Sequence, residues 1–393
     1  MEAASHHLTR AISHGMGTET VISDWPALTS AEVARLLRHY PQAGKLQRLE
    51  WHSPRPFSAA CVVHTDAGEI FVKRHHVRVR DVNSLTEEHR FVAHLHARGL
   101  PVSVALLTED GASALADEHW TYEVFWLAPG VDLYRDALSW TPFSSRTHAY
   151  SAGAMLARLH QASQGYDAPA RAARPLICSF TIFSQEDPLR PLQAYIEQRP
   201  AIAEYLRERP WRGEVAQHLL PFHTRLKPYL DEMTPLWTHN DWHASNLLWS
   251  DGSALAQAHT VLDFGLSNRT CALHDVATAI ERNIVEWLAI PHRPDQLIHL
   301  DLLDALLDGY ASLSPLTARQ TRALAALLPL VHAEFALAEL GYFHGVTHSQ
   351  QNAALAYETY LLGHAAWFNG AEGQRLLGHL ERRAEALDLK QNP

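Results

Sequence analysis

The first 127 residues alternate between short apolar or β-branched runs and turn-forming residues. A helical pattern comes first, at residues 31–39, with Thr29 or Ser30 as its N-terminal cap. Three runs that favour strands follow, at residues 46–51, 60–64 and 69–73. The turn Asp66-Ala67-Gly68 between the last two runs is typical of a hairpin, so we expect an antiparallel sheet.

The apolar spacing then changes to a helical period over residues 85–98. This helix is expected to stop at Gly99, because glycine suits the backbone of a helix end and Pro101 follows closely. Strand character returns at residues 102–107 and 120–127. Ala128-Pro129-Gly130 then breaks the pattern, and we place a lobe boundary there.

Helical periodicity dominates from Ser145 onward. The apolar faces that show it contain Ala152, Met155, Leu156 and Leu159, and later Val276, Ile280, Ile284 and Trp287 or Leu288. Five predicted strands with one helix between them, followed by a mostly helical region, indicate the α+β fold class.

The composition limits the classes of function. With 393 residues, 47% of them hydrophobic, the chain can bury a sizeable core. It carries 33 Lys and Arg against 43 Asp and Glu, a net charge of -10, and no long basic run, so we do not expect a nucleic-acid partner. Residues 1–20 contain no apolar signal-peptide region, and no run of eighteen apolar residues occurs, so we expect a cytoplasmic protein without a membrane partner.

Cysteine and histidine do not point to a structural metal. The three cysteines lack paired spacing, which fits a reducing compartment. Among the 27 histidines, His239 with His243 is one candidate metal pair, and His89, His94 and His96 form another candidate group. Without a cysteine cluster or an H-E-x-x-H sequence, we do not expect zinc at either place.

The chemistry-bearing motif lies in the helical region. His239-x-Asp241 is followed by Asn246, and seventeen residues later an apolar run ends in Asp263-Phe264-Gly265. Phosphoryl transfer needs a carboxylate that positions a hydroxyl and accepts its proton, together with oxygen ligands for Mg²⁺. A carboxylate and an amide five residues apart on a tight loop can face one cavity, and a second carboxylate can reach it from the next hairpin.

This order of residues resembles the aminoglycoside phosphotransferase and choline kinase superfamily, including its homoserine-kinase-like and stress-response-kinase-like members. The resemblance implies a protein-kinase-like fold with two lobes that uses ATP and Mg²⁺. It assigns Asp241 as the catalytic aspartate, Asn246 and Asp263 as magnesium ligands, and His239 as the histidine that braces the catalytic loop. Asn240 stands where the family usually has glycine, which is a mild departure because asparagine tolerates left-handed backbone.

Four residues upstream complete the expected nucleotide site. Lys73, at the end of a predicted strand, is expected to bind the α- and β-phosphates, and Glu88 on the next helix to hold Lys73. Glu87 is a close alternative to Glu88, and a solvated surface charge is the ordinary role of either residue. Backbone groups of Phe125 and Leu127 are expected to bind adenine.

The loop that covers the phosphates departs from the glycine-rich pattern. Residues 53–58 contain Pro54 and Pro56, which donate no backbone amide. Arg55 or Ser58 is an alternative phosphate contact, and an ordinary hairpin turn is a further interpretation.

Two downstream features bear on the substrate. Asp275 is expected to begin and cap a helix over residues 275–287, a structural role. Only about ten residues separate Asp263-Phe264-Gly265 from this helix, too few for the long activation segment of a regulated protein kinase. Polar residues of the late helices are candidates for the acceptor pocket: Glu334, Glu339, Tyr342, His344 and His348.

We therefore expect residues 1–24 to form a flexible segment, 25–127 a nucleotide-binding lobe, and 128–393 a helical lobe with the catalytic loop and substrate pocket. The expected activity is transfer of the γ-phosphate of Mg·ATP to a hydroxyl of a small molecule. A Ser/Thr protein kinase of the stress-response type and a nucleotide-binding pseudokinase are the alternatives. Neither the acceptor nor the oligomeric state follows from the sequence.

Overall fold

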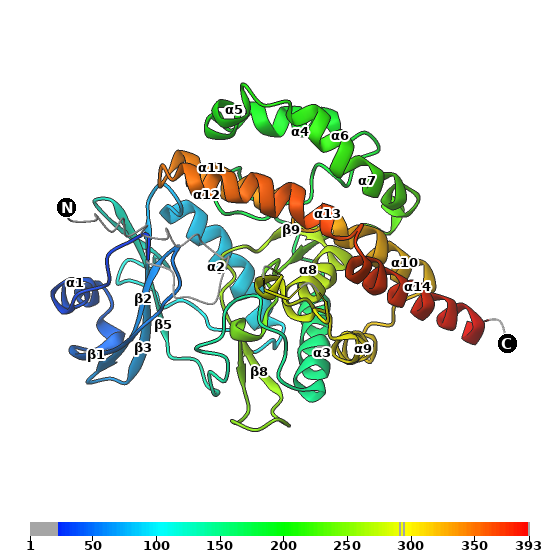
Figure 1. Ribbon diagram of the computed structural model, residues 1–393. Helices are drawn as coiled ribbons and strands as arrows, with labels where there is room; N and C mark the ends of the chain where they lie inside the picture. Colours follow the sequence, from blue (N-terminus) through cyan, green and yellow to red (C-terminus); the bar gives the residue numbers. More distant parts are fainter. Residues whose placement is uncertain (1–22, 291, 294, 392–393) are drawn as a thin grey trace, which may run out of the picture.

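The computed structural model describes residues 23–290, 292–293 and 295–391. The expected flexible segment 1–24 therefore lies almost entirely outside the described residues. The described chain forms a sheet-containing lobe and a larger helical lobe side by side (Figure 1). This arrangement confirms the α+β class and the two-lobed architecture.

The first lobe is built on an antiparallel sheet in the order β1-β2-β3-β5-β4. Its strands are β1 (Leu46–His52), β2 (Ala59–Thr65), β3 (Glu69–His76), β4 (Leu115–Asp117) and β5 (Trp120–Trp126). Two helices accompany it, α1 (Ser30–Leu36) and α2 (Val82–Ala97). Thr29 caps α1 in a reciprocal pair with Glu32, which explains why the helix begins there.

The strand predicted at residues 102–107 is wrong. That segment makes only isolated bridges, from Val102 to Val261 of the other lobe and from Ala105 to Phe125 of β5. Its hydrogen bonds are divided between two lobes, so it cannot form a continuous ladder with either. The fifth strand of the sheet is instead β4, which pairs with β5.

The second lobe is mostly helical. Its longer helices are α3 (Arg146–Ser163), α4 (Leu189–Glu197), α6 (Trp211–His218), α8 (Ala272–Ile284), α9 (Leu300–Ala311), α10 (Ala318–Leu327), α11 (Ala333–Gly345) and α14 (Ala371–Gln391). Shorter helices are α5 (Pro200–Leu206), α7 (Leu220–Leu226), α12 (Gln350–Ala354) and α13 (His364–Trp367), with a π-helical stretch η7 (Leu355–Gly363) between the last two. Two small antiparallel ribbons complete it: β6 (Pro235–Thr238) with β9 (Asn268–Cys271), and β7 (Leu247–Trp249) with β8 (Ala258–Val261).

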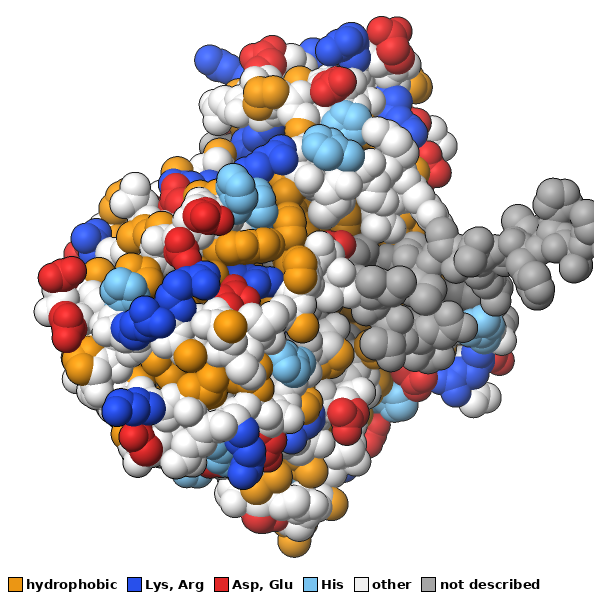
Figure 2. All heavy atoms as spheres, turned by 90° about the vertical axis from the view of Figure 1, so that its left-hand side faces the viewer, with side chains coloured by type: hydrophobic (Ala, Val, Ile, Leu, Met, Phe, Trp, Pro, Cys, Tyr) orange, Lys and Arg blue, Asp and Glu red, His pale blue; other side chains and the backbone are white. Residues whose placement is uncertain are grey.

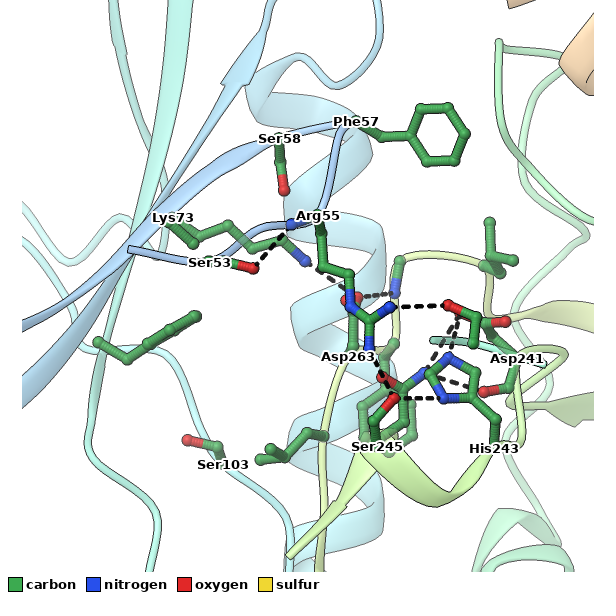
Figure 3. A pocket seen from close by; sticks show the side chains of 18 of the residues that line it. Ser53, Arg55, Phe57, Ser58, Lys73, Ser103, Asp241, His243, Ser245 and Asp263 are labelled. Carbon is green, nitrogen blue, oxygen red and sulfur yellow. Dashed lines mark hydrogen bonds and ion pairs between the residues drawn. The ribbon is translucent and has the colours of Figure 1, made fainter. Parts of the chain in front are cut away.

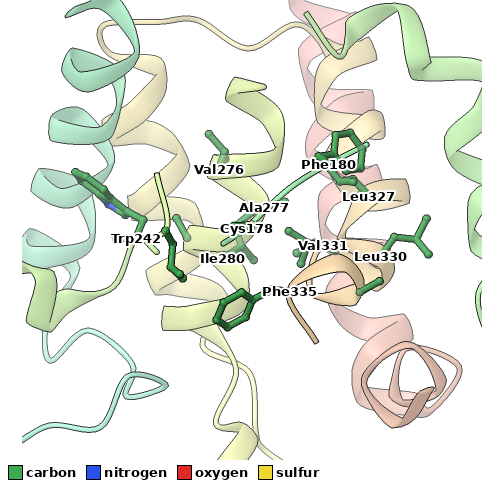
Figure 4. Close-up of a cluster of buried hydrophobic side chains, with 14 of the residues drawn as sticks. Cys178, Phe180, Trp242, Val276, Ala277, Ile280, Leu327, Leu330, Val331 and Phe335 are labelled. Carbon is green, nitrogen blue, oxygen red and sulfur yellow. The ribbon is translucent and has the colours of Figure 1, made fainter. Parts of the chain in front are cut away.

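Helix α8 is the central packing element of this lobe. Val276, Ala277 and Ile280 of α8 belong to one buried cluster with side chains from neighbouring elements (Figure 4). These neighbours include Leu327 at the end of α10 and Phe335 of α11. The cluster holds α8 beside the loop that follows β6, where the predicted catalytic residues lie.

The two lobes are joined just after β5. Val131 and Trp249 exchange backbone hydrogen bonds of 2.7 and 2.9 Å, so the chain belongs to the helical lobe from that point. Gly130 has φ +124°, and a Cβ there would lie 2.8 Å from the Leu248 Cβ, so the turn requires glycine. This geometry supports a boundary near residue 127, and we retain 25–127 and 128–393 as the proposed lobes.

One stretch, Ala318–Gly345, is long and apolar enough to cross a bilayer by length and composition. Of its most apolar 18-residue window, 94% is buried inside the protein, as in the core helix of a folded domain. On the face seen in Figure 2, Lys and Arg side chains are interspersed with Asp and Glu instead of forming one basic stripe. Both features agree with the expectation of no membrane or nucleic-acid partner, which stays a prediction.

Candidate active site

A cavity of about 440 Å³ lies between the two lobes and gathers most of the predicted site residues. The sheet lobe contributes Lys73, Glu88, Phe125 and Leu127, and the helical lobe contributes Asp241, Asn246 and Asp263. Figure 3 shows Asp241 and Asp263 on opposite sides of the Arg55 side chain, with Lys73 entering from the sheet. His239 is fully buried behind this cavity.

The loop after β6 presents Asp241 and Asn246 together. The Asn246 side-chain amide donates to the backbone carbonyl of Asp241 at 2.9 Å and to its carboxylate at 3.2 Å. Asn240 takes the left-handed φ of +61° that the turn demands. The left-handed backbone expected at this position is therefore present.

His239 connects the two halves of the motif. Its Nδ1 accepts the backbone amide of Asp241 at 3.2 Å, and its Nε2 donates to the carbonyl of Leu262 at 2.8 Å. Leu262 directly precedes Asp263, so one imidazole fixes the distance between the two acidic residues. This is the geometry expected of a bracing histidine.

Asp275 corrects a prediction. Helix α8 begins at Ala272 with Cys271 as its cap, so Asp275 neither starts nor caps this helix. Its buried carboxylate accepts the backbone amides of His239 at 2.9 Å and Asn240 at 2.8 Å, and pairs with His160 at 3.0 Å. The side chain is structural, as expected, but it supports the catalytic loop.

Asp263 is exposed to the cavity and pairs with the predicted phosphate-binding lysine. The Lys73 ammonium donates to its carboxylate at 2.9 Å. Burial alone would lower the pKa of Lys73, but Asp263, Glu123 and Glu88 outweigh burial and raise it. Lys73 therefore keeps its positive charge in the cleft.

The expected ion pair between Lys73 and Glu88 is not formed among the described residues. Lys73 is paired with Asp263, and the cation within ion-pair distance of Glu88 is Arg171, at 3.7 Å. Glu88 is buried at the cavity wall, whereas the side chain of Glu87 is 39% exposed. The choice of Glu88 over Glu87 is thus consistent with the geometry, while its direct contact with Lys73 is absent among the described residues.

Sequence reasoning missed a second buried carboxylate beside Lys73. Glu123 stands opposite Lys73 in the β3–β5 register and bonds His75 at 2.9 Å and His89 at 2.7 Å. All three side chains line the cavity. A lone glutamate within the apolar run of β5 was the available signal, because a charge in a buried strand needs a partner.

The expected adenine contacts need one correction. The backbone amide of Leu127 donates to the carbonyl of Glu69 at 3.0 Å, so this amide already has a partner. Phe125 pairs with Phe71 across the sheet, and its side chain lies at the cavity. The Leu127 amide is therefore not available to adenine, and the remaining adenine contacts of this segment stay a prediction.

Asp241 lies between the imidazole of His243 and the guanidinium of Arg282, which the motif did not identify together. His243 Nε2 and Arg282 each lie 3.5 Å from its carboxylate oxygens. Burial alone would raise the pKa of Asp241. The interactions with His243 and Arg282 outweigh burial and hold this pKa well below its usual value. Arg282 also stacks over Trp140 at 4.6 Å. The sequence signal for Arg282 was the charged pair Glu281-Arg282, which falls within the apolar periodicity of Val276, Ile280 and Ile284.

The oxygen donors of this site suit a hard divalent cation. Asp241, Asn246 and Asp263 supply two carboxylates and one amide from two adjacent loops. Carboxylate and carbonyl oxygens are the ligands that Mg²⁺ prefers, and no cysteine lines this cavity. The donor set therefore fits magnesium better than zinc.

Known structures share the fold. A microcompartment-associated aminopropanol kinase is 18% identical with a TM-score of 0.56, covering 86% of this chain and 95% of its own. The amicoumacin kinase hAmiN, in complex with AMP-PNP, Ca²⁺ and Ami, is 15% identical with a TM-score of 0.52, covering 93% and 95%. A thermostable mutant of the aminoglycoside phosphotransferase APH(4)-Ia, bound to ADP and hygromycin B, is 15% identical with a TM-score of 0.51, covering 87% and 99%.

Sequence comparison agrees with the fold. An uncharacterized protein, sll1119 of Synechocystis sp., is 26% identical over 286 residues, which are 70% of this chain and 68% of that protein. The family model described as "Phosphotransferase enzyme family" matches residues 54–316, a span that contains the predicted catalytic, nucleotide-binding and magnesium-binding residues but not the candidates for the acceptor pocket. With its motif converging on one cleft and its fold shared, this chain belongs to the phosphotransferase enzyme family.

Proposed function

We propose that the protein transfers the γ-phosphate of Mg·ATP to a hydroxyl of a small molecule. The observation that carries this proposal is the convergence of Lys73, Asp241, Asn246 and Asp263 on one interlobe cavity. Phosphoryl transfer requires positioning and charge neutralisation more than covalent chemistry, and these residues provide both.

Each residue has a role that its surroundings support. Asp241, kept ionised by Arg282 and His243, orients the acceptor hydroxyl and takes its proton. Asn246 and Asp263 would hold magnesium, which neutralises phosphate charge when it is bound. Lys73 steadies the phosphates with its ammonium group, and His239 and Asp275 keep the catalytic loop in place.

The far side of the cavity offers an acceptor site. Its walls are aromatic, formed by Trp140, Phe335 and Tyr360, and Glu339 contributes a carboxylate. Glu339 is 3% exposed, and its Oε2 lies 3.6 Å from His332 Nε2 but makes no hydrogen bond among the described residues. A buried carboxylate oxygen that makes no hydrogen bond favours an acceptor that brings a donor, such as an amine or a second hydroxyl.

The other polar residues suggested for this pocket are used elsewhere. Glu334 accepts the backbone amides of Thr181 and Ile182 at 2.9 and 2.7 Å, and Tyr342 donates to Asp24 at 2.6 Å. Neither they nor His344 and His348 line the cavity. Glu339 is thus the member of that group to which we assign an acceptor role.

A small acceptor is favoured over a protein substrate. Between Asp263 and α8 the chain forms β9, which pairs with β6, so no long activation segment stands there. The structural neighbours named for aminopropanol, or captured with hygromycin B, support a small-molecule acceptor as well. The pseudokinase alternative is disfavoured because none of the four residues that converge on the cavity is replaced.

We further propose a cytoplasmic location.

The experiment measures transfer of labelled γ-phosphate from Mg·ATP to pooled small hydroxyl metabolites and to a generic protein substrate. Replacing Asp241 by alanine should reduce transfer to a small molecule about 10²- to 10⁴-fold, as expected for loss of a general base. Asp110→Ala, at an exposed loop position, is the matched control and should leave transfer unchanged. Label in protein alone would favour the protein-kinase alternative, and absence of ATP binding would refute the proposal.

A further inference from the structure

The β1–β2 loop cannot bind phosphate in the way that a glycine-rich turn does. Pro54 and Pro56 have no backbone N–H, and the amide of Arg55 between them donates to the Ser53 hydroxyl at 3.3 Å. Three consecutive positions of this loop therefore offer no available backbone donor to a nucleotide. A nucleotide in the cavity needs another donor at this point.

The side chain of Arg55 enters the cavity between the two acidic residues of the motif (Figure 3). Its guanidinium donates to Ser245 Oγ at 2.8 Å, to the Ala137 carbonyl at 2.9 Å and to Ser139 Oγ at 3.2 Å. Ser245 belongs to the catalytic loop, so the contact crosses from one lobe to the other.

These acceptors are all neutral oxygens. Asp241 and Asp263 act on the Arg55 charge from the same cavity, but no carboxylate lies within ion-pair distance of it among the described residues. A partly buried cation that lacks a contacting anion carries a cost that a ligand can offset by supplying one. A planar guanidinium binds phosphate oxygens through paired hydrogen bonds, which makes phosphate the fitting counter-ion.

The loop is held firmly enough to preorganise this side chain. Phe57 packs edge-on against Tyr342 of α11, with ring centroids 5.3 Å apart. The indole of Trp25 donates to the Phe57 carbonyl at 3.1 Å, and the amide of Asp24 to the Pro56 carbonyl at 3.2 Å. The loop is thus anchored to the helical lobe and to the chain before α1, and Arg55 is held over the catalytic loop.

We propose that Arg55 binds the β- or γ-phosphate of the nucleotide, in place of the backbone amides of a glycine-rich turn. This inference rests on the proposed function, because it assigns a residue to the same ATP site. Of the two residues that the loop sequence suggested, Ser58 also lines the cavity, but Arg55 alone carries charge between Asp241 and Asp263.

The test compares the binding of Mg·AMP-PNP and of adenosine by calorimetry in the full chain. Arg55→Ala should weaken Mg·AMP-PNP about 10- to 100-fold, the range for hydrogen bonds to a charged group, and leave adenosine unchanged. Arg55→Lys should fall between, because it keeps the charge but not the paired geometry. The control is Arg48→Ala, which removes an exposed arginine of β1 that pairs with Glu50, and it should bind both ligands as wild type does.

Three results would overturn the inference. Equal weakening of both ligands would show that Arg55 only supports the fold of the cleft. Unchanged Mg·AMP-PNP binding in Arg55→Ala, with normal binding by wild type, would refute the Arg55 assignment and leave the proposed function standing. A wild-type protein that binds no Mg·AMP-PNP would refute the proposed function together with the inference.

Discussion

Asp275 accepts a hydrogen bond from the backbone amide of Asn240 at 2.8 Å, although the two residues lie on different elements. Asn240 has a φ of +61°, a conformation that residues other than glycine adopt at a cost. A buried carboxylate on α8 therefore holds the left-handed turn that places Asp241 in the cavity. We expect this one contact to contribute both to the stability of the fold and to the position of the catalytic residue.

Replacing Asp275 by asparagine should lower the free energy of unfolding by about 1.5–3 kcal/mol, the usual contribution of hydrogen bonds to a charged group. The asparagine side chain has only one acceptor oxygen. It therefore cannot accept the backbone N–H groups of both His239 and Asn240 and also pair with His160, as the two carboxylate oxygens of Asp275 do. Urea unfolding measures the change. Asp110→Asn, at an exposed position, should unfold like wild type, and an equally stable Asp275→Asn would contradict this role.

Protonation of His274 should lower the free energy of unfolding at acid pH. Burial lowers the pKa of this imidazole from 6.5 to about 4, against the opposing effect of Asp275. Between these two pH values the unfolded chain binds a proton that the folded chain does not, so stability falls as pH falls. The full loss is about 3 kcal/mol and is complete below the folded pKa.

Unfolding free energies at pH 7, 5.5 and 4 would check this linkage in wild type and in His274→Gln. The variant should show a loss between pH 7 and pH 4 that is about 3 kcal/mol smaller than in wild type. Other buried histidines whose pKa is also lowered, such as His364, should account for part of the pH dependence that remains. His259→Gln, which removes an exposed histidine, should keep the wild-type slope. Parallel slopes in wild type and His274→Gln would show that another group causes the acid sensitivity.

Gly309 of α9 should not tolerate a side chain. Helices α3 and α9 lie against each other (Figure 1), and a Cβ at Gly309 would collide with the backbone of Tyr150. Gly309→Ala should therefore destabilise the protein by about 1–3 kcal/mol, the usual effect of overpacking. Gly213→Ala in α6 meets no atom within 4 Å and should be neutral or slightly stabilising. Similar melting temperatures for the two variants would exclude close backbone packing as the constraint.

Replacing Glu339 should weaken binding of the acceptor and leave binding of the nucleotide unchanged. Glu339→Gln keeps the shape of the side chain but removes the charge that faces the aromatic walls, so the KM of the acceptor should rise about tenfold. The KM of Mg·ATP should stay unchanged, because the proposal assigns the nucleotide and magnesium to Lys73, Asn246 and Asp263 and not to Glu339. Glu358→Gln, at a 59% exposed side chain that pairs with Arg209, is the control. A change in the KM of Mg·ATP alone would refute this assignment.

Sequence patterns alone located most of the sheet, helices α1, α2, α3 and α8, and the catalytic motif. Strand and helix periods are local properties, and the residues from His239 to Gly265 carry their roles in their spacing. The same local view failed at residues 102–107, where the apolar run looks like a strand but its bonding partners lie in two lobes.

Only the tertiary structure decided which distant charges meet. Lys73 and Asp263 are 190 positions apart, as are Arg55 and Ser245, and Glu123 reaches His75 and His89 across the sheet. No short-range period encodes these contacts, because each depends on how the lobes and helices pack. The sequence by itself thus determined the elements and the chemistry of the motif. The packing of the lobes decided the partners of Lys73, the position of Arg55 and the acceptor side of the cavity, because polar groups that become buried must find their partners among residues distant in the chain.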